Sequence, residues 1–124
     1  MYKLDIINFY KTGNNIIDNN IKKLINITNK LIAYINKGAC AEEISNIIFL
    51  LIFYAQENIK NKEKILRNNN KFTDDIKTHH KNFTNKILEY KNAFANGEKN
   101  ICIDIYKFLI LWINNENKIN KQIF

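Results

Sequence analysis

The stretch that decides the fold runs from residue 44 to residue 66 and reads ISNIIFLLIFYAQENIKNKEKIL. Its apolar side chains recur at steps of three and four residues, which is the period of one face of an α-helix. The positions on this face are Ile44, Ile48, Leu51, Ala55, Asn58, Lys62 and Ile65. Asn58 and Lys62 thus put an amide and an ammonium on the inner face of a helix, ahead of Ile65. This pattern predicts a polar site inside the fold.

Three further stretches carry an apolar face of the same period. The predicted helices cover residues 14–36, 41–67, 73–95 and 99–124. Besides the stretch above, the inward positions are Ile17, Ile21, Leu24, Thr28, Leu31, Ile35, Ile76, His80, Phe83, Ile87, Tyr90, Phe94, Ile105, Leu109, Trp112, Glu116, Ile119 and Ile123. Four amphipathic helices joined by short loops are typical of an up-down-up-down bundle, so the predicted fold class is all-α.

The ends of these helices carry residues that suit them. Gly38 and Gly97 follow the first and third helices, where a glycine in the left-handed conformation commonly ends a helix. Thr73 begins the third helix, where a hydroxyl can accept from a first-turn N–H. Residues 1–12 form an N-terminal arm, and its apolar side chains are Leu4, Ile6, Ile7, Phe9 and Tyr10. The 124 residues of the chain fit a single domain with one core.

The charge of the chain is basic. It has 19 Lys and Arg against 12 Asp and Glu, which gives a formal net charge of +7. Such a surplus is one requirement for binding nucleic acid. The lysines are spread along every segment, however, and arginine occurs once, at Arg67. Because specific recognition of phosphates and bases relies on arginine forks, the composition favours a solvated lysine-rich surface over a nucleic-acid binder.

The two cysteines, Cys40 and Cys102, have no metal-binding spacing. They stand at the starts of the second and fourth helices, which are diagonal partners in an up-down-up-down bundle. We therefore expect two separate, reduced thiols and a cytoplasmic protein. The longest apolar run, residues 47–55, is too short to cross a bilayer, and no segment has the order of a signal peptide. We expect no membrane insertion.

Four polar residues interrupt the inward faces: Asn58, Lys62, His80 and Glu116. In a bundle, polar groups on facing helices are where metals and cofactors are held. The alternative is structural, because Lys62 and Glu116 can extend to water near helix ends and a core histidine can simply be hydrogen bonded. His79 follows Asp75 by four residues, which is the spacing of a pair on a helix surface.

Four segments, in order along the chain, carry a resemblance: YKTGNNIIDNNIKKL (10–24), YAQENIKNKEKIL (54–66), IKTHHKNF (76–83) and FLILWINNENKINK (108–121). They resemble the signatures of the hemerythrin family, four-helix bundles that hold two irons and bind O2 reversibly. The residues that fit are Tyr10, Gly13, Ile17, Asp18, Lys22, Leu24, Tyr54, Glu57, Glu63, Ile65, Leu66, His80, Phe83, Phe108, Leu109, Trp112 and Ile113. The resemblance implies a hemerythrin-like bundle with its site between the helices.

The resemblance also implies where a diiron site would lie. The family's five histidine positions fall on Ile21, Asn58, Ile76, His80 and Glu116, and its two bridging carboxylates fall on Lys62 and Lys121. Of these ligands only His80 is kept. An ammonium has no lone pair for a metal and repels a dication, so we predict neither metal nor cofactor here. A Lys62–Glu116 pair, with Asn58 and His80 as hydrogen-bond partners, is expected in its place.

Three functions remain open at this point. The first is a metal-free hemerythrin-like module with an interaction, structural or sensory role, and with a protein partner or a second copy of the chain. The second is residual binding of a metal ion, such as iron, or of O2, through unusual ligands that include His80 and Glu116. The third is a basic nucleic-acid or membrane-surface binder. No nucleophile with a neighbouring base and no Gly-rich phosphate loop is visible, so we do not expect an enzyme.

Overall fold

The computed structural model describes residues 2–4 and 9–124 of the chain. The elements are α1 (Asn15–Asn36), α2 (Cys40–Tyr54), η1 (Ala55–Ile59), α3 (Lys60–Asn68), α4 (Asp74–Ala95) and α5 (Ile101–Ile123). The described residues contain no strand, so the predicted all-α class is confirmed. No described helix combines the length and the apolar character needed to cross a membrane.

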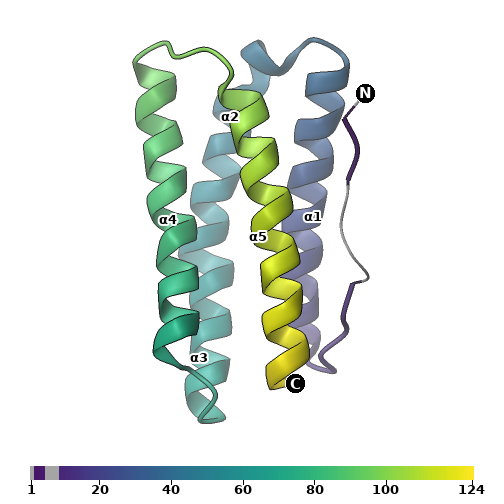
Figure 1. Ribbon diagram of the computed structural model, residues 1–124, viewed down its shortest axis with the longest axis vertical. Coiled ribbons are helices and arrows are strands. Elements are labelled where there is room, and N and C mark those ends of the chain that lie inside the picture. Colours follow the sequence, from purple (N-terminus) through teal and green to yellow (C-terminus); the bar gives the residue numbers. More distant parts are fainter. Residues whose placement is uncertain (1, 5–8) are drawn as a thin grey trace.

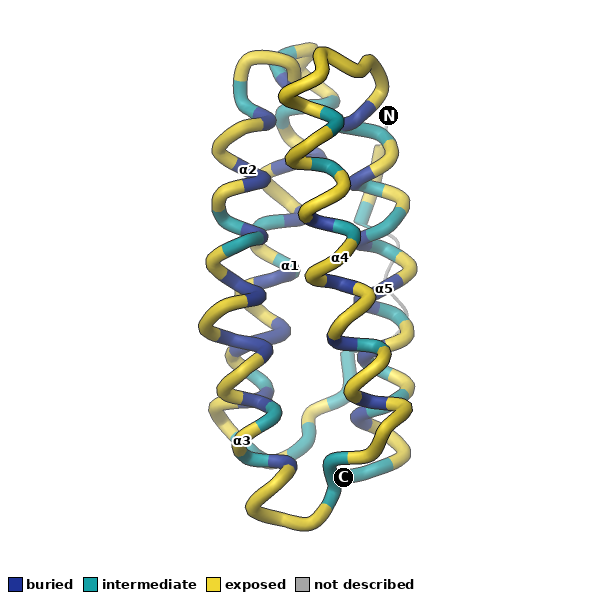
Figure 2. The backbone as a smooth tube through the Cα atoms, turned by 90° about the vertical axis from the view of Figure 1, so that its left-hand side faces the viewer, coloured by how far each residue is buried: buried dark blue, intermediate teal, exposed yellow. Residues whose placement is uncertain are grey.

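The long helices lie side by side and run in alternating directions (Figure 1). α1 packs against α2 and α5, and α4 packs against the same two helices. α1 and α4 are therefore one diagonal pair, and α2 and α5 are the other. Buried residues line the inner sides of the helices along their length (Figure 2). Burial of these apolar side chains, at about 25 cal/mol per Å2, is the main term that stabilises the bundle.

The second long helix differs from the regular helix predicted for it. α2, η1 and α3 follow one another without a break, and η1 is a π-helical turn. Asn58 and Lys62 keep their predicted inward places, and the next inward position comes four residues after Lys62 instead of three. Leu66 is fully buried, whereas the predicted Ile65 is only half-buried. The π-turn also forms the wall of a surface cleft that is described below.

Some predicted core positions toward the ends of the helices are less buried than expected. Phe94, in the last turn of α4, is 42% exposed, so its prediction as a core residue is wrong. Ile35, Tyr90 and Ile119 are only partly buried. The predicted steps of four and three average 3.6 residues, so the period is right. These residues lie toward the ends of α1, α4 and α5, where fewer side chains cover the inner face.

The helix ends follow the predicted signals. Gly38 and Gly97 have φ values of 70° and 73°, and each directly follows the turn that ends its helix. The hydroxyl of Thr73 accepts from the Ile76 N–H at 3.3 Å and caps α4. Asn14 caps α1 by accepting from two first-turn N–H groups.

The described residues of the N-terminal arm contact the ends of α1 and α5. The N–H of Tyr2 donates to the Asn36 side chain at 2.9 Å, at the end of α1. The N–H of Tyr10 donates to Asn117 on α5 at 2.6 Å. The Tyr10 hydroxyl donates to the Phe124 carbonyl at 3.1 Å. Ile6 and Ile7, named above as packing residues of the arm, lie outside the described residues.

The prediction of two separate thiols is wrong. Cys40 and Cys102 form a disulfide that joins the start of α2 to the start of α5, with their Cα atoms 6.4 Å apart. The two helices are diagonal, as predicted, but they are also in contact. A Cα separation of 6.4 Å lies within the range that a disulfide bridges. The expectation of a cytoplasmic location rested on reduced thiols, and it loses that basis because disulfides persist in oxidising compartments.

Candidate functional site

A cluster of polar side chains lies inside the bundle between α3, α4 and α5. Lys62 comes from α3, His80 from α4, and Glu116 and Asn120 from α5. These four residues are between 2% and 5% exposed. His79 on α4 joins them from the edge of the core, with 13% of its side chain exposed. We call these five residues the interior cluster.

The ammonium of Lys62 is the centre of this cluster. It donates to the Glu116 carboxylate and to the Asn120 side-chain oxygen. The Lys62–Glu116 pair is the pair that the sequence predicted, and the extension of both groups to water is excluded by their burial. A buried pair of this kind holds together only when further hydrogen bonds satisfy its remaining groups, and Asn120 supplies one.

Two imidazoles approach the other oxygen of the same carboxylate. Nε2 of His79 lies 3.5 Å from Glu116 Oε2, and Nε2 of His80 lies 4.0 Å from it. Both Nε2 atoms are buried, and neither has a hydrogen-bond partner in the described part of the chain. The Nδ1 atom of His80 lies 2.8 Å from Glu63 Oε2. Because a carboxylate only accepts, Nδ1 donates, and the Nε2 of a neutral His80 keeps its lone pair.

His79 is not the surface partner of Asp75 that its spacing indicated. Its ring stacks on Trp112, with centroids 4.5 Å apart and planes 2° from parallel. The indole N–H of Trp112 donates to the backbone carbonyl of His79 at 3.2 Å. Stacking on α5 therefore turns His79 inward, where it approaches Glu116.

The environment shifts the pKa values of three groups around the cluster. Burial tends to raise the pKa of Glu116, but the Lys62 ammonium and the neighbouring imidazoles outweigh it and lower that pKa to about 2. Burial lowers the pKa of His80 against the opposing pull of Glu116. Burial, followed by the charge of Glu116, raises the pKa of Tyr54 well above its ordinary value. At neutral pH the cluster therefore holds an ionised Glu116 beside a neutral His80.

The seven positions implied by the resemblance do not all meet. Ile21 and Ile76 are both 4% exposed and fill the core with apolar volume. Lys62, His80 and Glu116 belong to the interior cluster. Lys121 is exposed, so it does not take the inward place that a bridging ligand would need. Asn120, one residue earlier, has that place and contacts Lys62.

Asn58 is buried, but it is not a partner of the Lys62–Glu116 pair as predicted. It pairs with Asn20 on α1 instead. The Asn58 side-chain amide donates to Asn20 Oδ1 at 2.8 Å, and the Asn20 amide donates to the Asn58 backbone carbonyl at 2.9 Å. Each of these two asparagines thus satisfies the other within the core.

Sequence reasoning missed Asn20, Asn120 and the inward turn of His79. A signal existed for two of them. Asn20 is three residues after Ile17, and Asn120 is four residues after Glu116, so both fall on an inward face when that face is read as a band about 100° wide. No sequence signal marks His79, because its inward turn depends on the stacking partner that α5 presents.

The residues present do not fit a diiron centre. Among the seven positions, only His80 and Glu116 carry an imidazole or a carboxylate, and the Lys62 ammonium contacts that same carboxylate. Within residues 2–4 and 9–124, no group of three or more His, Cys, Asp or Glu side chains is arranged to hold a metal ion. The interior cluster is built to compensate one buried cation with one buried anion.

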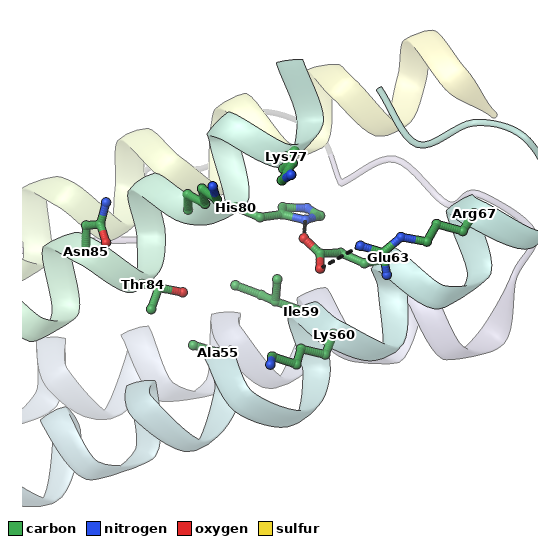
Figure 3. Close-up of a pocket in the computed structure, with 10 residues that line it drawn as sticks. Ala55, Ile59, Lys60, Glu63, Arg67, Lys77, His80, Thr84 and Asn85 are labelled. Carbon is green, nitrogen blue, oxygen red and sulfur yellow. Dashed lines mark hydrogen bonds and ion pairs between the residues drawn. The ribbon is translucent and has the colours of Figure 1, made fainter. Parts of the chain in front are cut away.

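His80 and Glu63 also border a cleft on the surface. This cleft has a volume of about 420 Å3 and lies between the η1–α3 segment and α4 (Figure 3). Figure 3 shows Glu63 placed between His80 and Arg67. The Arg67 guanidinium lies 4.0 Å from the Glu63 carboxylate. The interior cluster and the cleft thus share one hydrogen bond, that of His80 with Glu63.

Comparisons with protein-family models, with curated proteins and with solved structures each gave no match. The family resemblance therefore rests on the four sequence segments alone. The fold class rests on the helices and their packing. Function has to be argued from the two sites that these helices create.

Proposed function

We propose that this protein is a hemerythrin-like four-helix bundle that works without metal, as an interaction, structural or sensory module and not as an enzyme. One observation carries the proposal. The ammonium of Lys62 lies inside the bundle at a position where the resemblance puts a bridging carboxylate, and it contacts Glu116 and Asn120. A fixed cation at that point opposes a metal dication.

The apolar replacements support the same proposal. Ile21 and Ile76 occupy two positions where the resemblance puts histidines, and both are buried. Isoleucine offers no donor atom and fills the space that an imidazole and a metal would share. The core at these positions is therefore packed with apolar side chains. The buried charges lie in the Lys62–Glu116 pair, where each compensates the other.

Exposed aromatic side chains support an interaction role. Phe49 and Phe53 stand one turn apart on α2 and are 67% and 52% exposed. Adjacent exposed aromatics are typical of surfaces that contact other proteins. A protein partner or a second copy of the chain is thus the expected partner, in preference to nucleic acid.

The second candidate function is residual binding of a metal ion such as iron. It is favoured by the two buried Nε2 atoms of His79 and His80, which lack partners among the described residues and lie near Glu116 Oε2. Imidazole and carboxylate together suit several transition metals. Against it stands Lys62, which already engages the same carboxylate.

Iron reconstitution separates the two candidates. The purified protein is incubated with ferrous iron without air, desalted, exposed to air, and then analysed for metal content and absorption. A metal-free module gives a colourless protein with no bound iron. Stoichiometric iron, or the charge-transfer bands of an oxo-bridged pair, would overturn the proposal and favour the second candidate. A His80→Ala variant then shows whether any retained metal depends on the interior cluster.

A further inference from the structure

The cleft between η1–α3 and α4 gathers positive charge that is dispersed in the sequence. Its cations are Lys60, Arg67, Lys77 and Lys81, and Arg67 is the only arginine of the chain. They come from two neighbouring segments, α3 and α4, and stand on both sides of the cleft (Figure 3). Folding thus produces a local concentration of cations that the spacing of the lysines along the chain did not indicate.

Little negative charge offsets these cations. Among the described residues, Glu63 is the one carboxylate that lines the cleft. It is already engaged by His80 at 2.8 Å and by Arg67 at 4.0 Å. Lys60, Lys77 and Lys81 take part in no ion pair with another described residue. Three ammonium groups are therefore available to an anion from solution.

This cleft has more cations than the others. A cleft of about 380 Å3 has two, Lys86 and Lys107, and one of about 280 Å3 also has two, Lys23 and Lys30. A further cleft of about 360 Å3, between α4 and α5, is lined by Glu89, Glu98 and Asp104 and by no lysine or arginine. The chain carries a net charge of +7, so some lysines would border any hollow by chance. Four cations in one cleft, against none to two in these others, make it the most basic of these hollows.

Part of the cleft wall is apolar and comes from the π-turn. Ala55 and Ile59, the first and last residues of η1, both line it. π-Turns occur frequently at functional sites, because the extra residue changes the direction in which side chains project. Here the turn places two small-to-medium apolar groups beside the cations. A ligand with both a charged and an apolar part matches this wall.

Arg67 lies beside an aromatic ring and a carboxylate, and 60% of its side chain is exposed to solvent. Its guanidinium lies 4.6 Å from the centre of the Phe72 ring and 4.0 Å from Glu63. The planar fork of an arginine matches the oxygens of a phosphate. The volume of about 420 Å3 falls in the range of sites for small molecules.

We propose that this cleft binds a small organic phosphate, with the phosphate oxygens on Arg67 and the lysines and the organic part against Ala55 and Ile59. The proposal goes beyond the metal-free function and does not depend on it, since all four cations lie outside the interior cluster. The ligand expected in this cleft has at least one phosphate group joined to a compact apolar body.

The test is a titration of the full chain with phenyl phosphate and with pyrophosphate, followed by NMR of the backbone amides in about 0.1 M salt, where long-range attraction is screened. The matched variants each remove two exposed lysines: Lys77→Ala with Lys81→Ala in the cleft, and Lys22→Ala with Lys118→Ala on α1 and α5. Equal loss of charge makes the second pair a control for general electrostatics.

We expect phenyl phosphate to shift the amides of residues 55–59 and 77–81, and the cleft variant to bind it about tenfold or more weakly, while the control pair changes affinity less than about twofold. An Arg67→Lys variant keeps the charge and loses the fork, so it should also weaken binding. Equal effects of the two double variants, or no binding of either probe at millimolar concentration, would overturn the proposal. Tighter binding of a short oligonucleotide, with a steep dependence on salt, would overturn it in favour of a nucleic-acid site.

Discussion

Lys62 and Glu116 are charged side chains inside the core of a small bundle, each at most 5% exposed. Removing a charge from water costs several kcal/mol, and their mutual attraction repays this only when the remaining polar atoms are satisfied. Asn120 satisfies part of the ammonium. The pair therefore fixes the relative position of α3 and α5 more than it adds to the total free energy of unfolding.

The first prediction concerns this pair. Replacing Lys62 by Met or Glu116 by Leu alone should lower the free energy of unfolding by about 3–5 kcal/mol, because each leaves an uncompensated buried charge. The double variant should be close to the wild type. Urea unfolding of the four proteins gives the coupling energy from a double-mutant cycle.

The control for this cycle is an exposed pair on α4. Lys86 Nζ lies 3.3 Å from Glu89 Oε2, and the two side chains are 43% and 64% exposed. Their replacement by Ala should give a coupling of about 0.5 kcal/mol or less, because water screens the pair. A coupling between Lys62 and Glu116 no larger than that of the control would show that the buried pair does not form.

The second prediction concerns acid. The pKa of Glu116 is lowered from 4.5 to about 2, so its contribution is complete above pH 4.5 and is lost as the pH falls toward 2. By linkage this is worth about 3 kcal/mol. The pKa of His80 is lowered from 6.5, so the folded protein also loses stability as the pH falls below 6.5. The free energy of unfolding should decrease steadily as the pH is lowered from 7 to 3. In the Glu116→Gln variant, the free energy of unfolding should depend less on pH below pH 4.5. An unchanged slope in that variant would contradict the assignment.

Among the elements, the π-turn of the second long helix is held by a side chain from α1. The Asn20 amide donates to the Asn58 carbonyl within η1 at 2.9 Å. The third prediction is that Asn20→Ala destabilises the protein by about 1–3 kcal/mol, because it leaves buried polar groups without a partner. Asn19→Ala, at an exposed position on the same helix, should change stability by less than about 0.5 kcal/mol. Equal effects of the two variants would remove Asn20 from this role.

The disulfide is a second link between elements, and it joins α2 to α5. It closes a sequence separation of 62 residues between α2 and α5. The fourth prediction is that Cys40→Ser with Cys102→Ser lowers the free energy of unfolding by about 4 kcal/mol, the chain-entropy value for such a loop. A mass measured without reductant should be lower by two protons than the mass of the reduced chain. Identical masses would show free thiols.

Sequence periodicity predicted these elements well where a local signal exists. The helix ends at Gly38 and Gly97 follow from the conformational freedom of glycine, and the inward positions of Lys62 and Glu116 follow from helical spacing. The π-turn could not be predicted, because spacing assumes a regular helix. The disulfide could not be predicted either, because a period says which face a residue is on but not how near two diagonal helices come.

At the scale of the whole molecule, two sites lie back to back on the same helices. The interior cluster lies between α3, α4 and α5, and the cleft lies on the outer side of α3 and α4. The hydrogen bond of His80 with Glu63 connects them. The protein as a whole thus combines a closed charged core with an open basic surface.

The central claim is that the charged core replaces a metal centre, and iron uptake tests it most directly. The wild type is compared with a variant that carries I21H, N58H, K62E, I76H, E116H and N120D, which restores ligands at the positions implied by the resemblance and uses the inward residue 120 in place of the exposed Lys121. A matched variant with K121D instead of N120D serves as the control. Circular dichroism checks that all three proteins are helical. After reconstitution with ferrous iron and desalting, we predict no iron in the wild type, stoichiometric iron in the variant with N120D, and less in its control. Stoichiometric iron in the wild type would contradict the account.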